Sequence, residues 1–275
     1  MLPPTDAAPD RTVRSRDGTP IAVFSAGLGP PLMLLHGAAA DHTTFRVVGP
    51  LLAERYAVHA IDRRGRGASG DTSPYAIERE YEDVAAVASA LAADGGAPVD
   101  VFGHSYGGRC ALGAALLTAD IGRVVSYEGA PTPPGERYGD AALADDLARL
   151  AVEGRGEALL ETFMTRIVGM TAADLAAYRA DPIWPRRVRA APTIARELLV
   201  EAGEAAGLEQ LGRVRQPVLQ LLGGDSKPEF GIATRALDAR LADGRIVVLP
   251  GAKHAAHHTH PAAVVAAVTS FLAGN

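Results

Sequence analysis

The stretch Val99-Asp100-Val101-Phe102-Gly103-His104-Ser105-Tyr106-Gly107-Gly108 organises the interpretation of the whole chain. Its first residues have the apolar, β-branched character of a strand, and a helix-prone run over residues 109–117 follows directly. Gly103 and Gly107, two residues before and two residues after Ser105, have no β-carbon that could collide with a neighbouring strand or helix. A strand-to-helix turn of this kind holds its central serine in a strained conformation and exposes the hydroxyl above the sheet. The stretch therefore predicts that Ser105 is a nucleophile.

Five further apolar runs predict strands that alternate with helices and are buried in a parallel sheet. These runs are Leu32–Leu35, Ala57–Ile61, Val124–Tyr127, Val218–Leu222 and Ile246–Leu249, and residues 12–25 predict an additional hairpin. Polar or glycine-rich segments follow several of the runs, at the sheet edge where ligands bind in folds of this class. We expect an α/β fold with a mostly parallel, eight-stranded sheet flanked by helices, and a functional site at that edge.

The alternation of strands and helices stops between about residues 131 and 212. This segment predicts only helices, over residues 141–152, 157–167, 172–180 and 193–203, and prolines separate several of them. The strand pattern resumes at Val218. We therefore expect a core made of residues 1–130 and 213–275, with residues 131–212 inserted as a helical cap over the site.

Composition excludes several classes of function. The net charge of −5 is unsuited to nucleic acid as the main partner, because phosphate binding requires a basic surface. The one cysteine, Cys110, cannot form an intrachain disulfide, and no apolar stretch has the length of a membrane span. With no signal peptide recognised at residues 1–10, the prediction is a cytoplasmic protein that binds neither nucleic acid nor membrane.

Four motifs occur together in a fixed order along the chain. They are His36-Gly37-Ala38, Asp62-x-Arg64-Gly65-x-Gly67-x-Ser69, Gly103-His104-Ser105-Tyr106-Gly107-Gly108 and Pro250-Gly251-x-x-His254. In this combination the chain resembles the α/β-hydrolases, in their capped esterase- and lactonase-like branch. The resemblance covers nearly the whole chain outside residues 131–212, and it is far more specific than any single motif.

The resemblance assigns a role to several residues. His254, on the loop after the last strand, is the base that takes the proton of Ser105, because a serine hydroxyl is a poor nucleophile without one. The backbone N–H groups of Ala38 and Tyr106 form the oxyanion hole. Asp62 belongs to a structural turn in this family. No cofactor is implied, and no metal site is expected from His257, His258 and His260, since the chain places no thiol or carboxylate beside them.

The acid that orients His254 has two candidates. In most members of the family it follows the strand that is Val218–Leu222 here, where Asp225 lies. In a second group, which includes some dehalogenases and fungal zearalenone-lactone hydrolases, the acid ends the preceding strand, where Glu128 lies. A carboxylate that ends a buried strand needs a partner, because burying an unpaired charge is costly. We favour Glu128, with Asp225 as the alternative.

These assignments predict a serine hydrolase that cleaves a small carboxylic ester or lactone through an acyl-enzyme. Carbon–carbon hydrolysis or a lyase reaction on the same residues, or a ligand-binding receptor with little turnover, are the alternatives. The expected substrate-contacting residues lie in the cap: Trp184, Phe163, Met164 and Ile167. Whether the protein is a monomer or a homodimer is left open by the sequence.

Overall fold

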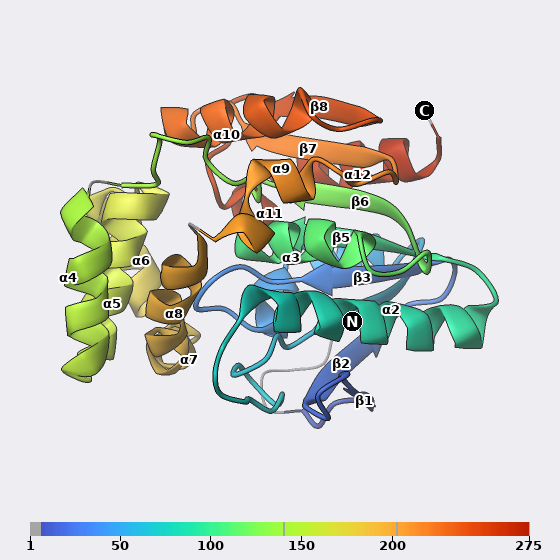
Figure 1. Ribbon diagram of the computed structural model, residues 1–275, viewed down its shortest axis with the longest axis horizontal. Coiled ribbons are helices and arrows are strands. Elements are labelled where there is room, and N and C mark those ends of the chain that lie inside the picture. The colour runs from blue at the N-terminus through green and yellow to red at the C-terminus, as the bar shows by residue number, and fades with distance from the viewer. Residues whose placement is uncertain (1–6, 140, 202, 275) are drawn as a thin grey trace.

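The computed structural model describes residues 7–139, 141–201 and 203–274. Within these residues, eight strands form one sheet in the order β1-β2-β4-β3-β5-β6-β7-β8 (Figure 1). The strands are β1 (Arg11–Arg14), β2 (Pro20–Ala26), β3 (Pro31–Leu35), β4 (Ala57–Ile61), β5 (Val99–His104), β6 (Ile121–Tyr127), β7 (Val218–Gly223) and β8 (Gly244–Leu249). β2 pairs antiparallel with β1 and β4, and the other neighbours pair in parallel. The mostly parallel, eight-stranded sheet is thus confirmed.

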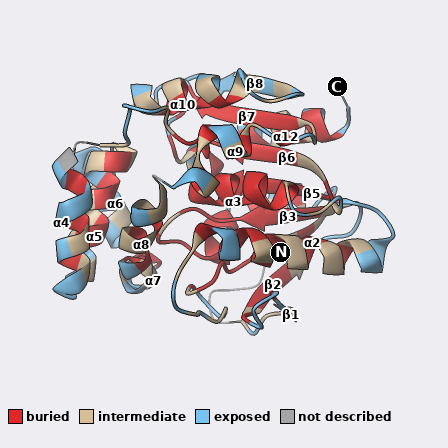
Figure 2. Cartoon of the chain, in the orientation of Figure 1, coloured by how far each residue is buried: buried red, intermediate tan, exposed pale blue. Residues whose placement is uncertain are grey.

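Helices cover both faces of the sheet. They are α1 (Val48–Leu52), α2 (Ile77–Gly95), α3 (Tyr106–Ala115), α9 (Leu208–Leu211), α10 (Pro228–Asp238), α11 (Ala256–Thr259) and α12 (Pro261–Leu272). Strand β3 shows why the central strands are apolar without interruption. Met33 and Leu35 pack on one face with α2 and α3, while Leu32 and Leu34 pack on the other with α1 and α12. Figure 2 shows the central strands buried accordingly.

A group of helices lies between β6 and β7 in the chain and beside one end of the sheet (Figure 1). It consists of α4 (Ala141–Val152), α5 (Gly156–Phe163), the π-helical turn η2 (Met164–Val168), α6 (Ala172–Ala180), α7 (Trp184–Ala190) and α8 (Pro192–Glu201). We call residues 141–201 the helical insertion. Leu143, Leu147 and Leu150 repeat at helical spacing on α4 and are buried in the apolar cluster that holds these helices together.

The last part of the segment 131–212 packs differently. The short helices η3 (Glu204–Ala206) and α9 contribute Ala206, Leu208 and Leu211 to the apolar cluster of α2 and α3. The expected helix over residues 193–203 ends at Glu201, and α7 was not expected. Of the described helices, none combines the length and the apolar character that a membrane span requires.

Close backbone packing at the end of β5 generates a prediction about stability. A β-carbon on Gly103 would lie 2.4 Å from the carbonyl oxygen of Gly107, so Gly103→Ala must force strand and helix apart. We expect a loss of about 3 kcal/mol or more in the free energy of unfolding, measured by urea denaturation. Gly95→Ala is the matched control, since a β-carbon there meets no atom within 4 Å. The control should be neutral or stabilised by up to about 1 kcal/mol; equal losses in both variants would contradict the steric argument.

Candidate active site

Ser105 occupies the turn between β5 and α3. Its backbone has φ 54° and ψ −127°, a region that non-glycine residues rarely adopt and that is strained for serine. The turn is held from two sides: the Ser105 N–H donates to the Tyr127 carbonyl at 2.7 Å, and a β-carbon on Gly107 would lie 2.3 Å from the Leu35 carbonyl oxygen. This packing leaves Ser105 in the wall of a cavity beyond the strand ends.

Glu128 and His254 lie against each other at the same edge. Nδ1 of His254 is 2.5 Å from Oε2 of Glu128, and Oε1 of Glu128 accepts a hydrogen bond from the Gly223 N–H at 2.7 Å. Both residues are buried: Glu128 has 3% and His254 has 6% of its surface exposed. An ionised carboxylate only accepts hydrogen bonds, so Nδ1 of His254 is the donor and Nε2 keeps a free lone pair. Asp225, in contrast, is exposed.

The loop that carries His254 is fixed by residues around it. The Tyr127 hydroxyl donates to the Lys253 carbonyl and accepts from the Ala256 N–H at 3.1 Å. The ring of Phe230 stacks on the imidazole of His254 with centroids 4.5 Å apart. Neither Tyr127 nor Phe230 was predicted to belong to the site. The position of Tyr127 directly before Glu128 is a local signal that could have indicated it.

Two neighbouring histidines are held neutral by their surroundings. Nε2 of His104 donates to the His254 carbonyl at 2.8 Å, and burial together with the nearby His254 lowers the pKa of His104 well below its usual range. His36 donates from Nδ1 to the Gly37 carbonyl at 2.8 Å and accepts at Nε2 from the Arg63 N–H at 3.0 Å. Burial, and next the charge of Arg63, lower the pKa of His36 well below its usual range. Both act as fixed packing and hydrogen-bonding groups.

Cys110 is also removed from nucleophilic chemistry. It is completely buried in α3, and burial raises the pKa of its thiol far above its usual range. The thiolate is the reactive form of cysteine, so this side chain stays inert at neutral pH. Ser105 is the remaining nucleophile candidate in this part of the fold.

The segment after β3 passes directly beside Ser105. A β-carbon on Gly37 would lie 3.0 Å from Cβ of Ser105, and Ala38 lines the cavity together with Ser105 and Tyr106. Tyr106 begins α3, where backbone N–H groups have no partner within the helix. The two backbone segments expected to supply oxyanion donors thus meet at one cavity.

The cavity itself is small, about 40 Å³, and mostly apolar. Two of the four cap residues expected to contact substrate, Phe163 and Ile167, line it. The others, Trp184 and Met164, are buried in the apolar cluster of the helical insertion, where the Trp184 indole donates to Glu157 at 3.1 Å. The remaining wall comprises Arg109, Glu128, Gly129, Tyr138, Ile194, Glu197, Leu198, Glu201, Phe230 and His254.

Arg109 and Glu201 form the polar side of this wall. Their side chains make an ion pair at 2.8 Å, and α8 brings Glu201 there from the helical insertion. Arg109 stands four residues after Ser105 and therefore on the same face of α3. That spacing was a usable sequence signal for Arg109, whereas nothing local pointed to Glu201.

Asp62 accepts hydrogen bonds from the backbone of its own loop and of the segment that contains His42. Its Oδ1 accepts from the His42 N–H at 2.8 Å, and its Oδ2 accepts from the Ala68 N–H at 2.8 Å. A β-carbon on Gly67 would lie 1.9 Å from Oδ2, which explains the glycine of this motif. Asp62 is therefore a structural residue of the turn, as the resemblance implied.

Comparisons with known proteins agree with this fold. Residues 32–268 match the model of the Alpha/beta hydrolase family. The crystal structure of an alpha/beta hydrolase from Sphaerobacter thermophilus is 31% identical and superposes with a TM-score of 0.81, covering 95% of this chain and 100% of that one. The pimeloyl-[acyl-carrier protein] methyl ester esterase of Neisseria meningitidis is 28% identical over 96% of this chain and 98% of its own length. The esterase RhEst1 from Rhodococcus sp. is 26% identical, with a TM-score of 0.73, covering 96% of this chain and 98% of that one.

The buried histidines beside the site generate a prediction about pH. His257 is 2% exposed and lies 4.2 Å, between ring centroids, from both His104 and His258. Burial, and next the neighbouring His104, lower the pKa of His257 well below its usual range. The unfolded chain therefore binds more protons than the folded one below about pH 6.5, and each such histidine removes about 1.4 kcal/mol of stability per pH unit as the pH falls from there towards its folded-state pKa.

We expect His257→Gln to make the free energy of unfolding less dependent on pH between 6.5 and 5, measured by urea denaturation at several pH values. The comparison is of slopes, so a uniform loss of stability in the variant does not affect it. Parallel curves for variant and wild type would show that His257 does not titrate on unfolding in this range.

Proposed function

This chain belongs to the alpha/beta hydrolase family, and we propose that it is a serine hydrolase that cleaves a carboxylic ester or lactone. The observation that carries the proposal is the 2.5 Å contact between buried Glu128 and His254 at the cavity that Ser105 also lines. A nucleophile, a base and a carboxylate that orients the base are the three groups that acyl transfer requires. The similarity to the methyl ester esterase of Neisseria meningitidis and to the Rhodococcus esterase supports this class of reaction.

In the proposed acylation step, the Ser105 hydroxyl oxygen attacks the carbonyl carbon of the substrate. Nε2 of His254 accepts the hydroxyl proton, and Glu128 stabilises the positive imidazole through Nδ1. The negative charge that develops on the carbonyl oxygen is taken up by the N–H groups of Ala38 and Tyr106, each typically worth about 3–4 kcal/mol to the transition state. His254 then protonates the leaving alkoxide, which gives an acyl-Ser105 intermediate and an alcohol.

Deacylation repeats the same proton movements with water. His254 removes a proton from the water molecule as it attacks the acyl carbonyl, and the tetrahedral intermediate collapses to a carboxylic acid and free Ser105. For a lactone, alcohol and acid are parts of one product. Because Glu128 is already paired with the Gly223 N–H and with His254, it acts by orienting His254 and by stabilising the positive charge that forms on the imidazole.

We assign the choice of substrate to the helical insertion acting as a cap. Six of its residues line the cavity: Phe163, Ile167, Ile194, Glu197, Leu198 and Glu201. A larger surface groove lies beside the cavity and shares Tyr138, Ile167, Leu198 and Glu201 with it. The small apolar cavity favours a short acyl chain, while the groove accommodates a longer alcohol or acyl part.

The direct test of this proposal is hydrolysis of p-nitrophenyl butyrate by the wild type and by Ser105→Ala. We expect turnover in the wild type and a fall in kcat on the order of 10⁶ in the variant, since the three residues act as a unit. His254→Ala should fall by a similar factor. Retention of more than a few per cent of activity in either variant would rule out the assignment, and an inactive wild type would favour carbon–carbon bond cleavage or ligand binding instead.

A second test separates the two candidate acids. Glu128→Gln removes the charge that orients His254, and we expect kcat to fall about 10⁴-fold, as is typical when the triad acid is replaced by its amide. Asp225→Asn is the matched control and should keep nearly full activity, because Asp225 is exposed. The opposite ranking of the two variants would transfer the role of the acid to Asp225.

A further inference from the structure

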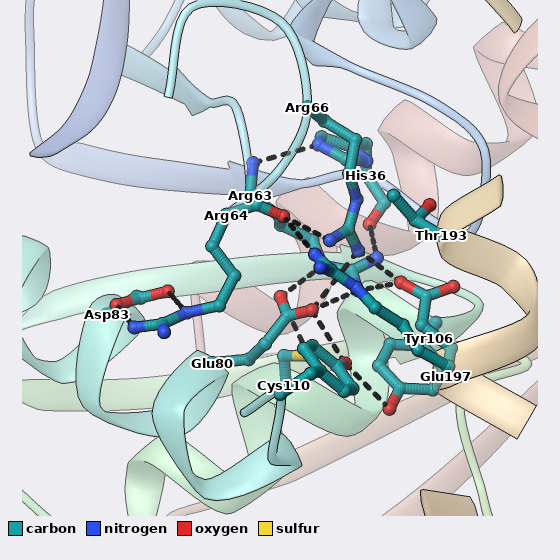
Figure 3. A network of polar contacts seen from close by, with 12 residues as sticks. His36, Arg63, Arg64, Arg66, Glu80, Asp83, Tyr106, Cys110, Thr193 and Glu197 are labelled. Carbon is teal, nitrogen blue, oxygen red and sulfur yellow. Dashed lines mark hydrogen bonds and ion pairs between the residues drawn. The ribbon is translucent and has the colours of Figure 1, made fainter. Parts of the chain in front are cut away.

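Four buried charged side chains connect the helical insertion to the core (Figure 3). Arg63 and Arg66 follow β4, Glu80 belongs to α2, and Glu197 comes from α8 of the insertion. Each is at most 2% exposed, and the two positive and two negative charges balance. Removing the charge of one member leaves a net buried charge in the cluster, which is far more costly than the loss of a surface ion pair.

Glu197 is the member through which the insertion takes part. Its Oε1 contacts the Nη2 atoms of both Arg63 and Arg66. Glu80 holds the same two arginines from the core side, with Oε2 accepting from Nε of Arg63 at 2.8 Å and Oε1 from Nη2 of Arg66 at 3.1 Å. The arginines are therefore held between a carboxylate of the core and one of the insertion.

Arg63 in turn contacts a residue of each of the two segments that surround the proposed oxyanion, His36 and Tyr106. Its N–H donates to Nε2 of His36 at 3.0 Å, and its Nη1 donates to the His36 carbonyl at 3.2 Å. His36 directly precedes the segment that leads to Ala38. The guanidinium of Arg63 also lies over the ring of Tyr106, 4.7 Å from its centroid. The Arg63 side chain thus supports Tyr106, which carries one proposed N–H donor, and His36, which lies two residues before the other donor, Ala38.

We propose that Glu197 is a positioning residue that couples the seating of the helical insertion to the geometry of the oxyanion hole. With α8 seated, Glu197 holds Arg63, and Arg63 holds the His36 peptide and the Tyr106 ring. The two N–H donors then point to the place where negative charge develops in the transition state. The inference rests on the proposed function, since it concerns the same acyl transfer.

A residue in this role has a recognisable kinetic signature. The carbonyl oxygen carries its full negative charge only in the transition state, so misaligned donors lower kcat and leave ground-state binding almost unchanged. A residue that held substrate directly would instead change KM, and one that only stabilised the fold would change the unfolding temperature without changing kcat of the folded enzyme.

The experiment measures kcat and KM for p-nitrophenyl butyrate in Glu197→Gln. We expect kcat to fall about 10- to 100-fold, less than the roughly 10²- to 10³-fold loss on removal of a whole oxyanion donor, because the donors are displaced and not removed; KM should stay within about threefold of wild type. Asp71→Asn is the matched control. Asp71 pairs at 2.6 Å with Arg196, the residue before Glu197, so this substitution weakens another contact between α8 and the core. Since this pair is partly exposed, the control should stay within about twofold of wild type.

Binding of a trifluoromethyl ketone gives a second readout. Ser105 adds to its carbonyl and forms a tetrahedral adduct whose oxyanion occupies the proposed hole. Glu197→Gln should weaken this inhibitor by about the factor lost in kcat/KM. Glu197→Asp keeps the charge that pairs with Arg63, so it should retain more kcat than Glu197→Gln; it also serves as the test variant if the glutamine variant does not fold.

The outcomes separate this inference from the proposed function. Wild-type turnover that is lost in Ser105→Ala supports the proposed function by itself. With an active wild type, unchanged kcat in Glu197→Gln, a change in KM alone, or equal losses in the Asp71→Asn control would overturn the positioning role only. A wild type that does not hydrolyse any ester or lactone tested would overturn both.

Discussion

Everything at the site depends on how closely the backbone passes itself at the end of β5. A β-carbon on Gly107 would lie 2.3 Å from the Leu35 carbonyl oxygen, and one on Gly129 would lie 2.7 Å from the Ser105 carbonyl oxygen. Without those β-carbons, the segments that follow β3, β5 and β6 converge on one cavity, and they bring Ala38, Ser105 and Glu128 into its wall. A parallel sheet aligns the strand ends at one edge, but this steric freedom is what brings them within reach of a single small substrate.

Buried charge is the second constraint. In two places, buried carboxylates are paired with hydrogen-bond donors or positive groups. Glu128 is buried with both oxygens occupied, by the Gly223 N–H and by His254. The carboxylates of Glu80 and Glu197 are likewise buried against guanidinium groups. Because an unpaired buried charge is strongly destabilising, each set permits few alternative arrangements. One set contacts the candidate base, and the other joins the helical insertion to the core.

Much of the fold was predictable because its signals are local. Uninterrupted apolar runs gave the strands of the sheet, and the predicted helices over residues 141–152 and 172–180 have the bounds of α4 and α6. The prediction missed α7, because its proline and arginine residues interrupt the spacing of apolar residues that indicates a helix. Trp184 of this helix packs with Tyr178. Within the segment 131–212, the leucines of α9 pack against α3 of the core. That packing depends on partners about a hundred residues away, beyond any local pattern.

For the site, the sequence by itself determined Ser105 and its turn, the loop of His254 and the strand ends around them, because glycine spacing and strand order follow from short-range backbone sterics. It also singled out Glu128, since a carboxylate that ends a buried strand requires a partner. Only the tertiary structure decided that Glu128, and not Asp225, lies against His254, that Phe163 and Ile167 reach the cavity while Trp184 does not, and that Glu197 meets Arg63 across 134 residues of chain. The physical reason is that these contacts depend on how the helical insertion packs on the sheet, and residues far apart in sequence carry no local record of that packing.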